Sequence, residues 1–210
     1  MIEIVWRLDH EVLDSEQVMG PLLDAICGVP GFEAASYDVN GRDQWRGFER
    51  VHAVVDALTQ RTQWLRIAGV DGVSLAMVAM GKHGEVPAMM MQLGAVDVGR
   101  MDELTADWGT VFEAVGVVYG ALSSAAWRSA LVDAGVAVRE QGESVGMVQA
   151  WGVGSEPANW QEIVAVVDRC EAMRRYQGGD LEILVLSDQE KIVDDEHAVA
   201  LGKVSALLNS

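Results

Sequence analysis

The C-terminal segment Gly178–Ser210 constrains the fold more strongly than any other part of the sequence. Leu181–Leu186 is a nearly continuous apolar run, which predicts a strand buried in a sheet. A polar, acidic connection follows over Ser187–Asp194. From Asp195 onward the apolar residues recur with the spacing of one helix face, at Ala198, Leu201, Val204, Leu207 and Leu208. The segment therefore predicts a strand, an acidic loop and a closing amphipathic helix that together display carboxylates.

The rest of the chain alternates between strand and helix patterns. Strands are predicted at Ile2–Leu8, Phe32–Asp38, Gln63–Ala68, Val73–Met80, Val86–Leu93 and Val145–Val153. Helices are predicted up to Cys27, over Phe48–Leu58, over Asp102–Asp133 with a break, and from Asn159, in a capping box with Glu162, to Arg174-Arg175. No internal repeat or linker is apparent. We therefore expect one α+β domain over residues 1–210, with a mixed or mostly antiparallel sheet packed with several helices.

The chain is strongly acidic, with 15 basic and 32 acidic residues and a formal net charge of −17. A surface this negative repels nucleic acids and anionic membranes, so we expect neither as a direct partner. It attracts a basic protein and accelerates their encounter. The alternative is that the charge serves solubility alone.

Several features favour a cytoplasmic location. No apolar run approaches the ~20 residues that span a bilayer. The first residues, MIEIVWRLDHEVLD, lack the basic, apolar and small-residue regions of a signal peptide. The two cysteines form no CxxC motif and indicate no disulfide framework.

Catalytic motifs are missing from the sequence, which contains no GxSxG, no GxxxxGK[ST], no HExxH and no dinucleotide-binding glycine fingerprint. The closest approach to an enzyme site is a group of acidic residues with one histidine, at Asp188, Glu190, Asp194, Asp195, Glu196 and His197. Its spacing is not that of an EF-hand, and acidic residues at a helix start are explained by capping and by the helix dipole. We therefore predict a protein that is not an enzyme and that has no metal or cofactor.

Trp45 differs from the other tryptophans, most of which lie on apolar faces typical of a core. It stands among polar residues beside Arg46, a combination that resembles the anchor of a protein interface. In the alternative, Trp45 folds back over the helix that follows. The candidate partner-binding residues are therefore Asp188, Glu190, Asp194, Asp195, Glu196, Trp45 and Arg46.

The tail resembles the C-terminal signature of the immunity protein 52 family. The resemblance rests on the strand Leu181–Leu186, on Asp188 and Glu190, and on the pair Glu196-His197 before the helix Ala198–Leu208. The strand Val145–Trp151 is similar to the family's glycine-aromatic strand, with the aromatic residue displaced, and the opening strand fits as well.

This resemblance implies a cytoplasmic bacterial immunity protein that binds a cognate toxin and protects the producing cell. Members of the family accompany polymorphic toxins, including type VI secretion system (T6SS) effectors with a restriction-endonuclease-like nuclease domain. Two alternatives stay open: an effector-loading adaptor or chaperone of the secretion apparatus, and a metal-dependent hydrolase using Asp188, Asp194, Asp195 and His197. The sequence also leaves open which surface binds the toxin and whether the protein forms a homodimer.

Overall fold

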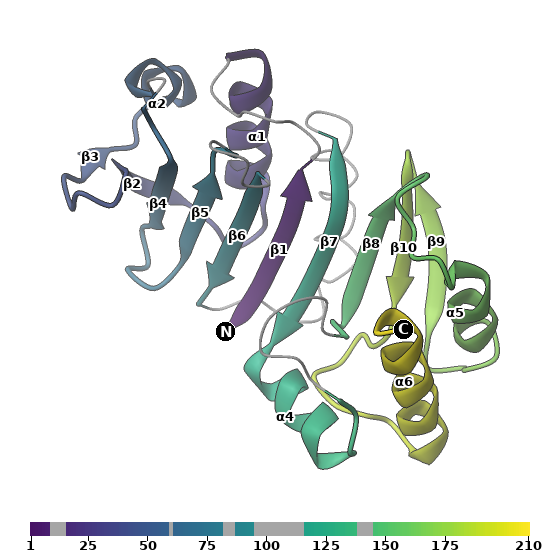
Figure 1. Ribbon diagram of the computed structural model, residues 1–210. Coiled ribbons are helices and arrows are strands. Elements are labelled where there is room, and N and C mark those ends of the chain that lie inside the picture. Colours follow the sequence, from purple (N-terminus) through teal and green to yellow (C-terminus); the bar gives the residue numbers. More distant parts are fainter. Residues whose placement is uncertain (9–15, 59–60, 82–86, 95–115, 138–144) are drawn as a thin grey trace. The chain divides into compact units, whose positions relative to one another are not determined.

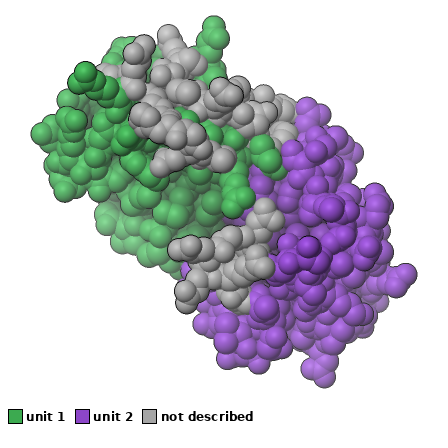
Figure 2. Space-filling model, viewed as in Figure 1, with its two compact units in different colours: residues 1–118 green, residues 119–210 purple. Residues whose placement is uncertain are grey.

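The computed structural model describes residues 1–8, 16–58, 61–81, 87–94, 116–137 and 145–210. The chain divides into two compact units, residues 1–118 and 119–210 (Figure 2). Each unit combines antiparallel strands with helices, so the predicted α+β class is confirmed. The single domain over residues 1–210 stays a prediction. No helix among the described residues is long and apolar enough to cross a membrane.

Unit 1 contains the N-terminal antiparallel strands (Figure 1). In chain order its elements are β1 (Ile2–Leu8), α1 (Glu16–Gly28), β2 (Ala34–Val39), β3 (Arg46–Gly47), α2 (Val51–Ala57), β4 (Trp64–Gly69), β5 (Leu75–Ala79) and β6 (Ala88–Leu93). The strands lie side by side in the order β3-β2-β4-β5-β6-β1. The two helices contact each other.

The core of unit 1 follows from alternating side chains along its strands. In β1 the apolar side chains of Ile2, Ile4, Trp6 and Leu8 are all buried. The neighbouring strand β6 buries Met89 and Met91. Met89 and Met91 are therefore core filler, because their flexible side chains fit irregular gaps between strands. Met77 of β5 and Met90 of β6 are half-buried.

Unit 2 contains four strands and three described helices (Figure 1). Its elements are β7 (Val117–Ser124), which begins at the end of unit 1, α4 (Ala125–Asp133), β8 (Val148–Gly152), α5 (Trp160–Val167), β9 (Arg174–Gly178), β10 (Leu181–Val185) and α6 (Asp195–Leu208). The strands lie in the order β7-β8-β10-β9 and are antiparallel to their neighbours. The tail prediction of a strand, a loop and a helix is confirmed by β10 and α6.

The middle of unit 2 is closely packed. All five residues of β8 are buried, and so are four of the five residues of β10. Gly146, just before β8, lies so close to β7 that a Cβ atom there would stand 2.7 Å from the carbonyl oxygen of Leu122. Only glycine permits this backbone approach.

Three expectations about local structure were wrong. Residues 117–124, assigned to a broken helix, form β7, because Tyr119–Leu122 pair with β8 and Tyr119 packs on Trp151 with ring centroids 5.6 Å apart. Arg174-Arg175, expected to end a helix, begin strand β9. Asn159 occupies the N-cap position of α5, but its side chain makes no capping hydrogen bond, and its Nδ2 donates to the carbonyl oxygen of Leu207 at 3.3 Å. The last part of the predicted broken helix is confirmed by α4, Ala125–Asp133, and residues 102–115 lie outside the described residues.

Candidate functional site

The acidic residues of the tail lie on the loop after β10 and on the first turn of α6. The Asp194 Oδ1 atom accepts a hydrogen bond from the backbone N–H of His197 at 2.8 Å, so Asp194 caps the helix. Asp195 and Glu196 occupy the first turn and are exposed. Negative charge at this position is stabilised by the helix dipole. The interpretation of these carboxylates as helix-start chemistry is confirmed.

Asp188 and Glu190 lie earlier in the same loop. Asp188 Oδ2 is 3.5 Å from Arg174 Nη1, and 54% of the Asp188 side chain is exposed. An exposed ion pair of this length contributes little to stability. Glu190 is half-buried. The structure therefore gathers all five acidic candidates on one loop and helix start.

His197 fixes the position of this loop. Its side chain is fully buried, with Nδ1 accepting from the backbone N–H of Val193 at 3.2 Å. The other ring nitrogen, Nε2, lies 2.7 Å from the carbonyl oxygen of Leu186. Since Nδ1 accepts, the proton resides on Nε2 and is donated to Leu186. His197 thus ties both ends of the loop to α6. Among the described residues, no group of three His, Cys, Asp or Glu side chains is placed to hold a metal ion.

The other two candidates, Trp45 and Arg46, lie in unit 1 at β3. The Trp45 side chain is 42% exposed. The guanidinium carbon of Arg66, on β4, lies 5.1 Å from the centroid of the Trp45 ring, which is a cation–π contact. The indole is therefore held against β4 with part of its surface in solvent. Trp45 and Arg46 belong to unit 1 and the acidic candidates to unit 2.

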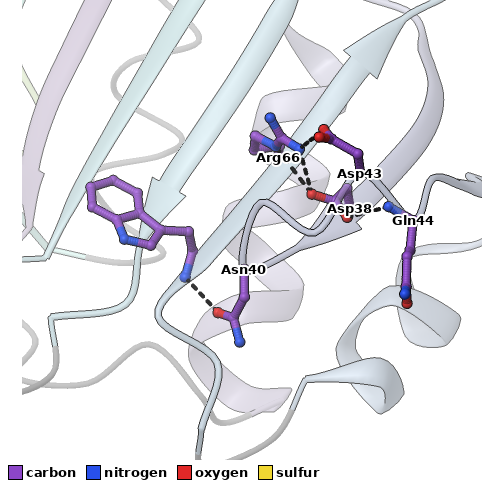
Figure 3. Close-up of polar contacts among 6 residues, drawn as sticks. Asp38, Asn40, Asp43, Gln44 and Arg66 are labelled. Atoms are coloured by element: carbon purple, nitrogen blue, oxygen red, sulfur yellow. Dashed lines mark hydrogen bonds and ion pairs between the residues drawn. The ribbon is translucent and has the colours of Figure 1, made fainter.

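A buried carboxylate organises this end of unit 1. Asp38 on β2 pairs directly with Arg66 on β4 in the strand register. The Asp38 Oδ2 atom accepts from Arg66 Nη2 at 2.7 Å and from Arg66 Nε at 3.1 Å (Figure 3). Arg66 Nη2 also reaches Asp43 Oδ1 at 2.7 Å, and the backbone N–H of Gln44 donates to Asp38 Oδ1 at 3.0 Å.

These contacts set the protonation of the pair. Burial by itself raises the pKa of Asp38, but hydrogen bonds from Arg66 and from the backbone of Gln44 outweigh it and hold the pKa below its usual value. The hydrogen bonds to Asp43 and Asp38 raise the pKa of Arg66. Both groups are therefore charged at neutral pH.

The loop between β2 and β3 is held in an uncommon backbone conformation. Asn40 and Asp43 have φ values of 60° and 55°, which side-chain hydrogen bonds make tolerable for these residue types. Asn40 Oδ1 accepts from the backbone N–H groups of Gln63 at 2.6 Å and Trp64 at 3.2 Å. The Asn40 side chain thereby fastens the loop to the start of β4.

A cavity of about 310 Å³ lies beside this network. We call it the arginine pocket, because three arginines lie among its lining residues, which are Tyr37, Asp38, Val39, Asn40, Arg42, Gln44, Arg46, Ala57, Arg61 and Thr62. Sequence reasoning missed it. The only signal was the presence of Arg42 and Arg46 on either side of Trp45, and nothing in the sequence places Arg61 beside them.

Acid should remove the stabilisation that the Asp38 carboxylate provides. Asp38→Asn is expected to lower the free energy of unfolding by about 2 kcal/mol at neutral pH, because it removes charge-assisted hydrogen bonds. Since the folded pKa lies below the ordinary 3.8, this contribution is complete above about pH 4 and is lost as the pH falls through the folded pKa. Urea unfolding of both proteins at neutral and acidic pH measures the difference, which should shrink in acid.

The neighbouring carboxylate provides the control for this experiment. The Asp43 side chain is 79% exposed and contacts the same guanidinium group. Asp43→Asn should cost at most about 1 kcal/mol. A loss for Asp38→Asn that stays constant from neutral to acidic pH would contradict the assignment.

The sequence has no match among protein-family models and none among curated proteins. Among solved structures, the chain is similar to a Pseudomonas aeruginosa T6SS protein, PA0821, with a TM-score of 0.62 and 8% sequence identity. The match covers 98% of this chain and 72% of that chain. The likeness is one of fold. The duplicated taurocyamine kinase from Schistosoma mansoni also matches, with a TM-score of 0.30 and 10% sequence identity. This match covers 99% of this chain and 31% of that chain, and its TM-score is too low to support an argument.

Proposed function

We propose that this protein is an immunity protein that binds and neutralises a cognate antibacterial toxin, a nuclease effector of a T6SS. The observation that carries the proposal is the fold shared with a T6SS protein over 98% of this chain. The resemblance of the tail to the immunity protein 52 family supports the more specific role.

The charge of the protein supports the choice of a nuclease. A nuclease that acts on DNA needs a basic groove for the phosphate backbone. A protein with a net charge of −17 is attracted to such a groove and can occupy it in place of the substrate. Inhibition in this way needs no catalytic group on the immunity protein.

We call Glu190, Asp194, Asp195 and Glu196 the acidic face of unit 2. This face is suited to the contact because its backbone is held in place. Asp194, Asp195 and Glu196 are exposed at the start of a helix, and His197 ties the preceding loop to that helix. A charge that is already in position loses little conformational entropy when it binds. We therefore assign this face the first contact with the toxin.

Co-expression in a susceptible bacterium tests the proposal. The toxin is the effector encoded beside this gene, produced from an inducible promoter with and without the protein. We expect survival only when the protein is present, together with a stable complex on size-exclusion chromatography. Equal killing in both strains would refute the immunity role.

The adaptor alternative predicts a different phenotype for the producing strain. Deletion of an immunity gene should poison the producer when its toxin is active. Deletion of a loading adaptor should leave the producer healthy and abolish export of the effector. A catalytically inactive toxin separates the two roles. With this toxin, a strain that lacks an immunity protein should be healthy and should still export the effector, whereas a strain that lacks a loading adaptor should still fail to export it.

A charge-neutralised variant tests the acidic face directly. Replacing Glu190 and Glu196 by Gln and Asp194 and Asp195 by Asn changes the net charge from −17 to −13 and keeps a capping residue at the start of α6. We expect association with the toxin to slow by about tenfold at low salt and to become less salt-dependent. Stopped-flow binding at several salt concentrations measures both effects.

The matched control removes four charges elsewhere. Glu33, Glu49, Asp24 and Asp56 are exposed carboxylates of unit 1, and their amide variants give the same net charge. This control should associate nearly as fast as the unchanged protein. Equal slowing in both variants would show that net charge acts without a specific face.

A further inference from the structure

The arginine pocket reverses the sign of charge that dominates the rest of the chain. Its lining contains three arginines and one acidic residue, Asp38, in a protein with a net charge of −17. The Asp38 carboxylate is buried and already accepts hydrogen bonds from Arg66 and Gln44. Arg66 is not one of the three arginines that line the pocket. It therefore does not neutralise the pocket arginines.

Arg42 and Arg46 have donors to spare. Both side chains are exposed. Within the part of the chain that the structure describes, neither guanidinium group makes an ion pair or a hydrogen bond. Each offers several N–H groups in a planar fork that matches the geometry of a carboxylate or phosphate. Two cations held near each other without a counterion favour the binding of an anion.

The walls of the pocket are preorganised. Tyr37 is buried and packs edge-on against Phe48, with ring centroids 6.5 Å apart. Asn40 fastens the loop that carries Arg42 to the start of β4, close to Arg61. Thr62 is fully buried and is part of the lining. A rigid concavity with a few polar groups beside an aromatic wall is typical of a small-ligand site.

We propose that the arginine pocket binds a small molecule that carries oxyanion groups, either carboxylates or phosphates. The cavity of about 310 Å³ is at the lower end of the range for small-molecule sites. An extended polyanion such as nucleic acid is disfavoured, because the net charge of −17 repels the phosphates that lie outside the pocket. A compact anion seats its charge among the arginines and avoids that repulsion. This site is separate from the acidic face assigned to the toxin.

Calorimetric titration with two compact anions tests the proposal and identifies the source of the oxyanion. Inorganic pyrophosphate represents phosphates and citrate represents carboxylates. Binding of pyrophosphate alone indicates a phosphorylated ligand, and binding of citrate alone indicates a carboxylate ligand. Binding of both at constant ionic strength also supports the oxyanion site. Absence of binding by both anions overturns the proposal.

Substitutions of the pocket arginines test whether an anion that binds the protein does so in this pocket. Arg42→Gln with Arg46→Gln should weaken the affinity by about tenfold or more, because it removes charge-assisted hydrogen bonds. Arg42→Lys with Arg46→Lys keeps the charge without the planar fork and should give an intermediate affinity. The four side-chain changes concern exposed residues, so near-ultraviolet circular dichroism should match that of the unchanged protein.

The control removes two cations from unit 2. Lys191 and Lys203 are exposed, and Lys191→Gln with Lys203→Gln changes the net charge by the same amount as the arginine double variant. Its affinity for the anion should equal that of the unchanged protein. Unaltered affinity in the arginine variant, or equal weakening in the two variants, overturns the assignment to this pocket.

Discussion

Trp127→Ala is expected to lower the free energy of unfolding by about 4 kcal/mol, the largest effect of any substitution considered. The Trp127 side chain is fully buried at the start of α4. Its Nε1–H donates to the carbonyl oxygen of Val145 at 2.9 Å, and its ring packs on the His197 imidazole with centroids 6.3 Å apart. Alanine leaves a large cavity beside His197 and removes the indole donor from the Val145 carbonyl oxygen.

Urea unfolding at neutral pH measures this loss. Trp127→Phe keeps most of the apolar ring and loses the hydrogen bond to Val145, so it should cost about 1–2 kcal/mol. Trp64→Ala is the control for removal of an indole, because the Trp64 side chain is 42% exposed. Trp64→Ala should cost clearly less than Trp127→Ala. Equal losses at the two positions would show that Trp127 does not anchor α4.

His197→Ala is expected to lower the free energy of unfolding by about 3 kcal/mol and to release the acidic loop. The substitution leaves the N–H of Val193 and the carbonyl oxygen of Leu186 without their partner and opens a cavity beside Trp127. Asp194 still caps α6 through the backbone of residue 197. The helix should therefore persist while the loop loses its attachment.

Hydrogen exchange separates these two effects. The Val193 amide should exchange much faster in His197→Ala, whereas exchange of the amides in the middle of α6 should accelerate only as far as the loss of global stability requires. His52→Ala is a control, since His52 is exposed on α2. An unchanged exchange rate at Val193 would contradict the role of His197 in holding the loop.

The elements that the sequence predicts well are those with a strong local pattern. β1 and β10 match the predicted bounds closely, because alternation or continuous apolarity is visible within one strand. β7 was missed because Tyr119 and Leu122 also fit helix spacing, and only pairing with β8 decides between the two. β9 was missed because Arg174-Arg175 suit a helix end as well as an exposed strand.

The candidate sites also differ in whether their residues are neighbours in the sequence or are brought together only by the fold. The acidic face is contiguous in the sequence, so its carboxylates are recognised without a structure, although their partner role stays a prediction. The ion pair between Asp38 and Arg66 depends on the register of β2 against β4, which joins residues 28 positions apart. The sequence indicates His197 only as a metal ligand or a family marker, because a buried hydrogen-bond bridge has no sequence signature.

The outer strands have a consequence for how the protein behaves when it is concentrated. β9 ends the strand order of unit 2 and β3 ends that of unit 1. Such strands present backbone groups to which another chain can add, and this is how amyloid-like assembly begins. Arg174, Arg175 and Arg46 are exposed on these strands. Arg174 and Arg175 pair with Asp188 and Asp168, and these charged groups would lose water if another strand were added beside them. Charged side chains on the outer strands therefore disfavour edge-to-edge pairing between two copies of the chain.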